Sequence, residues 1–231
     1  MKYSSGLNDK PYEMKDLTGK PHKFFEREIF ANGKGIREFA DIFYQYIKEK
    51  HPSASKALNY KEDADGSAMM DLILSENVLG HYSPLAFDLL KVIKELVIEA
   101  CEYYEIDFEK ERYYLHSWLN YAKGPRVVHD DQIKLDDHGW RPKHFHGYYA
   151  INAEPSTTFY ELDEPYEGHP SGYYPLENKN GRVLLSINGY QHGVGSWPKE
   201  EPRITLAYNI MPLSDLPYNP NKNYAQYLPL I

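Results

Sequence analysis

Two histidines and an aspartate in the second half of the chain supply side chains that a ferrous ion binds. His129 and Asp131 form a His-x-Asp pair, and His192 lies far beyond them along the chain. On a strand, residues two apart point to the same face, so the imidazole and the carboxylate of this pair can converge on one ion. Two imidazoles and one carboxylate leave open coordination positions on iron. The sequence therefore predicts a metal site formed by His129, Asp131 and His192.

An arginine at the start of the last expected strand adds a cationic group to this site. Arg203 is placed to hold an acidic co-substrate beside the metal. A guanidinium suits that task because it binds a carboxylate through two parallel hydrogen bonds.

A second pair of histidines leaves a different metal site open. His144 and His146 are also two residues apart, and together with His192 they would supply three imidazoles. The arrangement is similar to a cupin metal site, where a glutamate normally follows the pair within a few residues. Here the next glutamate is Glu154, so the fit is poor. We expect His144 to lie at the mouth of a strand, and His146 to line the cavity as a support for the metal ligands or as a substrate contact.

The first half of the chain predicts helices. Apolar residues recur at helical spacing over residues 36–47 and 84–104. The second of these segments starts with a proline that follows a serine, which is typical of a helix N-terminus. A short strand is expected over residues 23–29 and a short helix over residues 69–74.

The remainder of the chain predicts strands. Short runs rich in Tyr, Val, Ile, Thr and Phe alternate there with turn residues. Such a succession, without a long helix between the runs, indicates two antiparallel sheets in a sandwich or a jelly roll. The expected strands are residues 113–120, 126–129, 145–152, 157–162, 173–176, 182–187, 192–197 and 204–210.

The composition is that of a globular protein with a substantial core. Hydrophobic residues make up 42% of the chain and charged residues 26%. The net charge of −8 argues against binding to nucleic acid through its phosphates. No apolar run is long enough to span a membrane, the N-terminus lacks a signal-peptide core, and the single cysteine fits a reducing compartment. We expect a cytoplasmic protein with neither nucleic acid nor membrane as a partner, and the oligomeric state stays open.

The pattern of candidate ligands resembles the Fe(II)/2-oxoglutarate-dependent oxygenases. That superfamily carries His-x-Asp or His-x-Glu, a distal His and a trailing Arg on a double-stranded β-helix, and the resemblance covers residues 113–212. A narrower similarity, to small oxygenases of bacteria and their phages, rests on Trp118-x-Asn120, on the run from His146 to Ser156 and on the run from Glu201 to Ala207. Some of that group have a second His where this chain has Asp131, and the carboxylate weighs against a halogenase.

The resemblance implies a mixed α+β fold. The core would be a double-stranded β-helix (a cupin-like jelly roll), with the N-terminal helices packed on one sheet. We expect a single domain over residues 1–231. It would comprise a helical support region over 1–111, a jelly-roll core over 112–212 and a C-terminal tail over 213–231.

The resemblance also implies the cofactors Fe(II), 2-oxoglutarate as co-substrate, and O2. His129, Asp131 and His192 would bind iron facially and form the catalytic centre. Arg203 would pair with the far carboxylate of 2-oxoglutarate. Further contacts to the co-substrate would come from Thr205, Tyr149 and Asn120.

The implied reaction is hydroxylation of an unactivated C–H bond in a small polar substrate, such as an amino acid or a related metabolite, with release of succinate and CO2. Desaturation or ring closure would use the same residues. A cupin-type metalloenzyme without 2-oxoglutarate and a non-catalytic jelly-roll binding module also stay open. Substrate contacts are expected from His146 and from long loops that mix cationic and aromatic groups. The loop candidates are Trp140, Arg141 and Tyr166.

Overall fold

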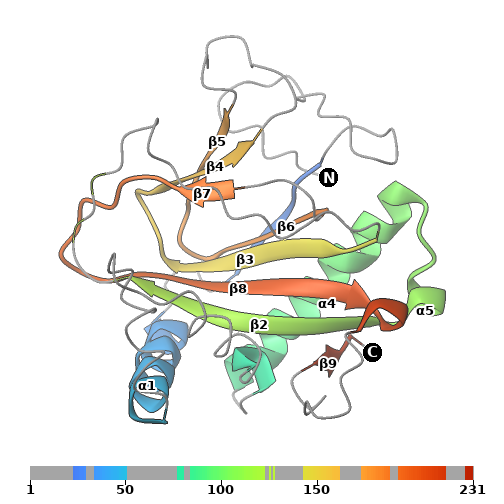
Figure 1. Ribbon diagram of the computed structural model, residues 1–231, viewed down its shortest axis with the longest axis horizontal. Coiled ribbons are helices and arrows are strands. Elements are labelled where there is room, and N and C mark those ends of the chain that lie inside the picture. Colours follow the sequence, from blue (N-terminus) through green and yellow to red (C-terminus); the bar gives the residue numbers. More distant parts are fainter. Residues whose placement is uncertain are drawn as a thin grey trace.

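Helices and two antiparallel sheets make up the computed structural model of this chain (Figure 1). The structure describes residues 23–29, 34–50, 77–80, 84–122, 125, 127, 143–161, 173–187, 192–216 and 227–230. The predicted mixed class with antiparallel sheets is confirmed.

Two long helices, α1 (Lys34–Lys50) and α4 (Pro84–Tyr104), contact the larger sheet. Helix α4 begins at a proline, which is tolerated in the first turn because the amide there has no partner within the helix. Its buried side chains recur every three or four residues, so they form one stripe that packs against β1 and β6. The stripe consists of Leu89, Ile93, Leu96, Val97 and Ala100. Both helices were predicted from their spacing, and both are confirmed.

Three short helical elements complete the helical part of the described chain. They are η1 (Val78–Gly80), α5 (Phe108–Glu111) and η3 (Leu213–Asp215). The carboxylate of Asp107 caps α5 by accepting a hydrogen bond of 3.0 Å from the backbone amide of Lys110.

The larger sheet has six strands in the order β1-β6-β3-β8-β2-β9. Figure 1 shows β3, β8 and β2 as its long central strands. The bounds are β1 (Phe25–Glu28), β6 (Arg182–Ile187), β3 (Phe145–Asn152), β8 (Arg203–Pro212), β2 (Tyr113–Ala122) and β9 (Leu228–Pro229).

The smaller sheet has three strands in the order β5-β4-β7. Its strands are β5 (Tyr173–Glu177), β4 (Thr157–Glu161) and β7 (His192–Val194). From β3 the chain passes to this sheet for β4 and β5 and returns to the larger sheet for β6. It then crosses again for β7 and returns for β8. The two sheets therefore exchange strands repeatedly along the sequence.

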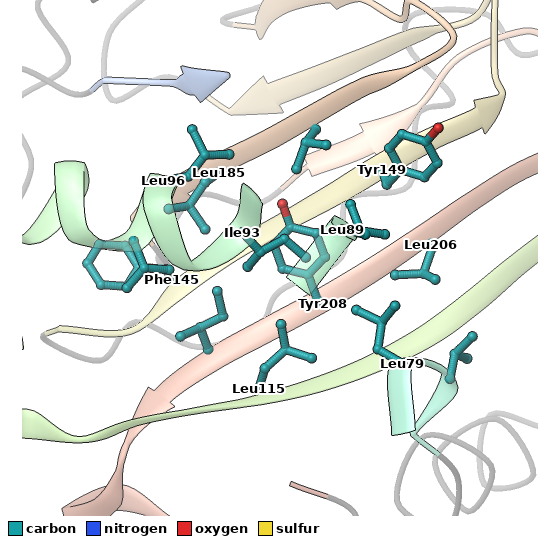
Figure 2. Packing of buried hydrophobic residues seen from close by; sticks show 14 of the residues in the cluster. Leu79, Leu89, Ile93, Leu96, Leu115, Phe145, Tyr149, Leu185, Leu206 and Tyr208 are labelled. Atoms are coloured by element: carbon teal, nitrogen blue, oxygen red, sulfur yellow. The ribbon is translucent and has the colours of Figure 1, made fainter. Parts of the chain in front are cut away.

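The two faces of the larger sheet have different surroundings. One face packs against α1 and α4 in the main hydrophobic cluster, part of which Figure 2 shows. Gly147 belongs to this face, and a Cβ there would lie 2.6 Å from the Tyr208 ring and would collide with the carbonyl oxygen of Leu184. The missing side chain lets the Tyr208 hydroxyl donate a hydrogen bond of 2.7 Å to that oxygen. The other face, which we call the inner face, packs against the smaller sheet through a second cluster that includes Tyr148, Leu184 and Tyr160.

Most predicted strand bounds lie within two residues of those observed, and those of β3 and β6 agree fully. The expected last strand was shorter than β8, and the expected strand over 192–197 extended beyond β7. The expected helix over 69–74 lies outside the described residues. Of the strand expected over 126–129 only Val127 is described, and it belongs to no strand and is 78% exposed.

None of the described helices is long and apolar enough to cross a membrane.

Candidate functional site

The inner face of the larger sheet gathers polar side chains from three neighbouring strands. In an antiparallel pair, directly opposed residues share a face, and Asn120 of β2 lies opposite Thr205 of β8. His146 of β3 lies opposite Asn209 of β8. Because alternate residues of one strand also share a face, Arg203, Thr205 and Asn209 line the same wall. The structure thus brings Asn120, His146, Arg203 and Thr205 onto one surface.

His146 and His192 meet across the two sheets. Their ring centroids are 4.7 Å apart, although His146 lies on β3 and His192 on β7. His146 is buried, and its Nδ1 lies 2.8 Å from the amide oxygen of Asn209. Since an amide oxygen only accepts, Nδ1 carries a proton and donates this bond. The inner face therefore presents two adjacent imidazoles, one of them oriented by Asn209.

The remaining predicted metal ligands, His129 and Asp131, lie outside the described residues. Within the described part of the chain, no three His, Cys, Asp or Glu side chains come close enough together to hold a metal ion. The donor set that is described at this point consists of the imidazoles of His192 and His146. As a ligand type, imidazole nitrogen binds iron as well as zinc or copper.

The rival site of three histidines is only partly brought together. His144 is buried, and its Nε2 lies 2.8 Å from a carboxylate oxygen of Asp215, in η3. This pairing occupies one of the two ring nitrogens of His144. In the structure, His146 therefore contacts His192, whereas His144 contacts Asp215.

Arg203 occupies a second region of the inner face. Its side chain is buried, and Nε donates a hydrogen bond of 2.9 Å to the hydroxyl of Ser156. Two residues along β8, the buried Thr205 hydroxyl accepts a hydrogen bond of 3.3 Å from the amide of Asn120. A guanidinium, a hydroxyl and an amide on one wall can bind a carboxylate.

A buried hydrogen-bond network lies behind Arg203, and sequence reasoning missed it. The amide of Asn178 donates to Ser156 at 3.0 Å and to Thr158 at 3.1 Å, and its oxygen accepts from Tyr148 at 2.6 Å. Burial raises the pKa of the Tyr148 hydroxyl, so this group stays protonated and donates. The alternation of β3 was the available signal, because it places Tyr148 on the same face as His146.

Tyr149 does not join this group, contrary to its expected role as a co-substrate contact. Opposed pairing aligns it with Leu206 and Val183, which belong to the helix-facing cluster. Figure 2 shows Tyr149 in that cluster. Its hydroxyl donates to the backbone oxygen of Ile29 at 3.3 Å. The physical reason is that neighbouring residues of a strand point to opposite faces.

Tyr160 leaves a polar atom inside the second cluster. It is 1% exposed, its ring centroid is 5.5 Å from that of His192, and burial raises the pKa of its hydroxyl well above the usual value. Among the described residues, nothing forms a hydrogen bond with this hydroxyl. The distance to His192 concerns the two rings, whereas the Tyr160 hydroxyl interacts electrostatically with the hydroxyls of Tyr148 and Tyr208.

The other expected substrate contacts, Trp140, Arg141 and Tyr166, lie outside the described residues. His146 is therefore the one expected substrate contact that the described chain contains.

Comparison with known proteins gave distant likenesses only. No family model matches the chain, and no curated protein matches it. Among solved structures, it is similar to the non-heme alpha ketoglutarate dependent carbocyclase SnoK from nogalamycin biosynthesis, with 10% identity, 91% of this chain and 86% of that chain covered, and a TM-score of 0.48.

Two further likenesses are of the same strength. A prolyl-4-hydroxylase of Pseudomonas putida shows 9% identity and a TM-score of 0.45, with 83% of this chain and 89% of that chain covered. EctD from S. alaskensis in its apoform shows 15% identity and a TM-score of 0.43, with 94% and 83% covered. Likeness at this level assigns neither a family nor an activity to the chain.

Proposed function

We propose that this chain is an Fe(II)- and 2-oxoglutarate-dependent oxygenase that hydroxylates an unactivated C–H bond of a small polar substrate and releases succinate and CO2. The observation that carries the proposal is the inner face. Arg203, Thr205 and Asn120 lie on it, and His192 meets His146 across the two sheets.

The buried guanidinium supports 2-oxoglutarate as co-substrate. Burial of a cation is costly unless an anion and hydrogen bonds compensate it. Arg203 is 7% exposed and its Nε donates to Ser156, and a guanidinium has the planar shape that binds a carboxylate through two hydrogen bonds. The hydroxyl of Thr205 lies on the same face and would add a contact to that carboxylate.

His129, Asp131 and His192 would hold the iron. His192 is on β7, which within the described chain pairs with a strand on one side only, namely β4. A further strand along the other edge of β7 would carry the first two ligands to His192. When bound, the ferrous ion supplies the activation of O2 that the side chains cannot supply themselves.

The passage of the chain between the sheets supports a jelly roll. After β3, consecutive segments enter and leave the smaller sheet, and β8 returns to the centre of the larger sheet between β3 and β2. We infer a double-stranded β-helix whose inner face is the site and whose helices cover the other face of the larger sheet.

The surroundings of His192 would bind a polar part of the substrate. The imidazole of His146 and the ring of Tyr160 are both buried and lie beside the His192 ring. A neutral imidazole can accept a hydrogen bond from a hydroxyl or an ammonium group. A small polar substrate, such as an amino acid, has groups of this kind.

Succinate formation tests the proposal. The protein, supplied with Fe(II) and 2-oxoglutarate under air, is expected to release succinate and CO2 even without a substrate. Asp131→Ala should abolish this release, because the metal loses its carboxylate ligand. Asp130→Ala removes the neighbouring carboxylate and should keep it. Absence of succinate from the wild type, or full activity in Asp131→Ala, would contradict the proposal.

A second candidate is a cupin-type metalloenzyme that uses His144, His146 and His192 without 2-oxoglutarate. The distance of 4.7 Å between the His146 and His192 rings favours it, and the pairing of His144 with Asp215 weighs against it. Iron content separates the two candidates. Loss of iron in His129→Ala but not in His146→Ala supports the oxygenase, and the reverse supports the cupin-type site.

A further inference from the structure

The structure assigns Ser156 as a positioning residue. It fixes the position of the Arg203 guanidinium and thereby sets the length of the 2-oxo dicarboxylate that the site accepts. This inference rests on the proposed function, which it deepens. It concerns a residue that does not touch the reacting atoms and acts through the guanidinium.

The hydroxyl of Ser156 has all of its hydrogen-bonding capacity in use. It donates to the carbonyl oxygen of Ala153 at 2.5 Å, and it accepts from Nε of Arg203 at 2.9 Å and from the amide of Asn178 at 3.0 Å. A serine hydroxyl offers one donor and two acceptor positions. Because none is left over, the hydroxyl cannot turn without breaking a buried bond, and it holds Nε in one place.

The groups that hold Ser156 are themselves buried and bonded. Asn178 and Thr158 are each 2% exposed, and their side chains exchange hydrogen bonds. The amide oxygen of Asn178 also accepts from the Tyr148 hydroxyl at 2.6 Å. A fully satisfied polar network inside a protein is rigid, because any rearrangement leaves a desolvated group unpaired.

The backbone of Arg203 is fixed independently of its side chain. It lies at the start of β8, which pairs with β2 on one side and β3 on the other. The amide of Asn152 donates a hydrogen bond of 2.7 Å to the carbonyl oxygen of Pro202, just before Arg203. This contact follows an irregularity in β3 between Ala150 and Asn152, and such a bulge re-aims side chains. Both the Cα and the Nε of Arg203 therefore have fixed positions.

A fixed guanidinium at one end and His192 at the other define a length. Ser156 immediately precedes β4, and Tyr160 of β4 lies opposite His192. Tyr160 is the fourth residue after Ser156, so their Cα atoms are about 13 Å apart along the backbone. A dicarboxylate that chelates at the His192 end must place its far carboxylate at the guanidinium. An added methylene group would move the far carboxylate away from the guanidinium. Binding should then weaken, because a misplacement of about 1 Å is costly in a rigid site.

The test compares two co-substrates that differ by one methylene group, 2-oxoglutarate and 2-oxoadipate. For Ser156→Ala we expect a roughly ten-fold rise in the KM for 2-oxoglutarate, since a charge-assisted bond that orients Arg203 is lost. The kcat should change less than the KM. The preference for 2-oxoglutarate over 2-oxoadipate should fall several-fold, because the guanidinium can then adjust. Ser156→Thr keeps the hydroxyl and should keep most of the preference.

Ser117→Ala is the matched control. Ser117 is also buried, and its hydroxyl donates to Asn77 at 2.5 Å and accepts from the amide of Leu79, but it lies on the helix-facing side of the sheet. The substitution Ser117→Ala removes a comparable buried hydroxyl that does not contact Arg203. It should destabilise the fold without changing the preference. Equal preferences in Ser156→Ala and the wild type would overturn the inference while leaving the oxygenase proposal intact.

A binding measurement makes the inference independent of turnover. Calorimetry with Mn(II) under nitrogen should show weaker 2-oxoglutarate binding in Ser156→Ala than in Ser117→Ala. Glutarate titrated into metal-free protein reports on the guanidinium alone, even if the wild type releases no succinate and the oxygenase proposal fails. Weaker glutarate binding in Ser156→Ala supports the positioning role, and equal binding in both variants overturns it. If Ser156→Ala does not fold, Asn178→Ala can replace it, because it removes a hydrogen bond that holds the Ser156 hydroxyl. It should also weaken the binding of both 2-oxoglutarate and glutarate.

Discussion

The two faces of the larger sheet use the same strands for different purposes. On β8, Leu206 and Tyr208 pack into the apolar cluster under the helices, whereas Arg203, Thr205 and Asn209 face the smaller sheet with polar atoms that are bonded to named partners. The helix-facing side is stabilised by apolar packing, and the inner side is stabilised by hydrogen bonds. Substitutions on one face should therefore change stability, and substitutions on the other should change chemistry.

The largest effect on co-substrate binding is expected from Arg203→Ala on the inner face. Loss of two charge-assisted hydrogen bonds to a carboxylate should raise the 2-oxoglutarate requirement by roughly two orders of magnitude. The iron requirement should change little, because Arg203 is not a predicted metal ligand. Steady-state kinetics with each component varied in turn measures both. A parallel rise in the iron requirement would contradict the separation of the two regions of the inner face.

Leu206→Ala is the counterpart on the helix-facing side of the same strand. Leu206 is 1% exposed and belongs to the main cluster, so its truncation should cost about 2–5 kcal/mol of unfolding free energy. Denaturant unfolding measures this loss. At a temperature where the variant is folded, its KM for 2-oxoglutarate should equal that of the wild type. A changed KM would mean that the two faces are coupled.

Gly147→Ala should have a smaller effect of the same kind. The added Cβ would meet the Tyr208 ring and the backbone oxygen of Leu184, and a strand can relieve the overlap only by shifting. We expect a loss of about 1–3 kcal/mol, the usual cost of overpacking. In a Tyr208→Ala background the same substitution should cost less than in the wild type, because the ring that the methyl group meets is gone. Purely additive effects would show that the clash with Tyr208 is not the cause.

The sequence predicted the strands well where apolar alternation and turn residues agreed, as in β3 and β6, and it predicted both long helices. Arg203 and Thr205 were predicted as a pair on one face, because they are two residues apart on one strand, whose alternation is fixed. Tyr149 was assigned from the resemblance without this test, and the alternation of β3 puts it on the other face from His146.

Ser156 and Asn178 could not have been predicted from the sequence. They are 22 residues apart, and their contact depends on how the segments around β4 and β5 fold over the inner face. Local pattern carries no information about such a pairing. The meeting of His146 and His192 is of the same kind, because it joins strands from different sheets. Contacts across the sheets therefore need the three-dimensional arrangement, whereas the faces of single strands do not.

The smallest effect expected is that of Tyr149→Phe, which tests the corrected position of this residue. Its hydroxyl makes one hydrogen bond of 3.3 Å, so removal should cost about 0.5–1.5 kcal/mol or less. Succinate release and the KM for 2-oxoglutarate should not change, because the side chain lies under the helices. A raised KM would return Tyr149 to the co-substrate site.

The same variant has a signature in alkaline solution. Burial raises the pKa of Tyr149 to about 12 from an ordinary value of 10.0. The folded chain therefore keeps this proton at a pH where the unfolded chain releases it, and the unfolding free energy falls as the pH rises from about 10 to about 12. Below pH 10 both states are protonated, so the residue adds no slope there. Phenylalanine has no proton to release, so the loss of stability across this window should be less steep in Tyr149→Phe than in the wild type. Equal slopes in the two proteins would mean that the Tyr149 hydroxyl is in contact with water. The face of the sheet on which Tyr149 lies would then not be covered by the helices.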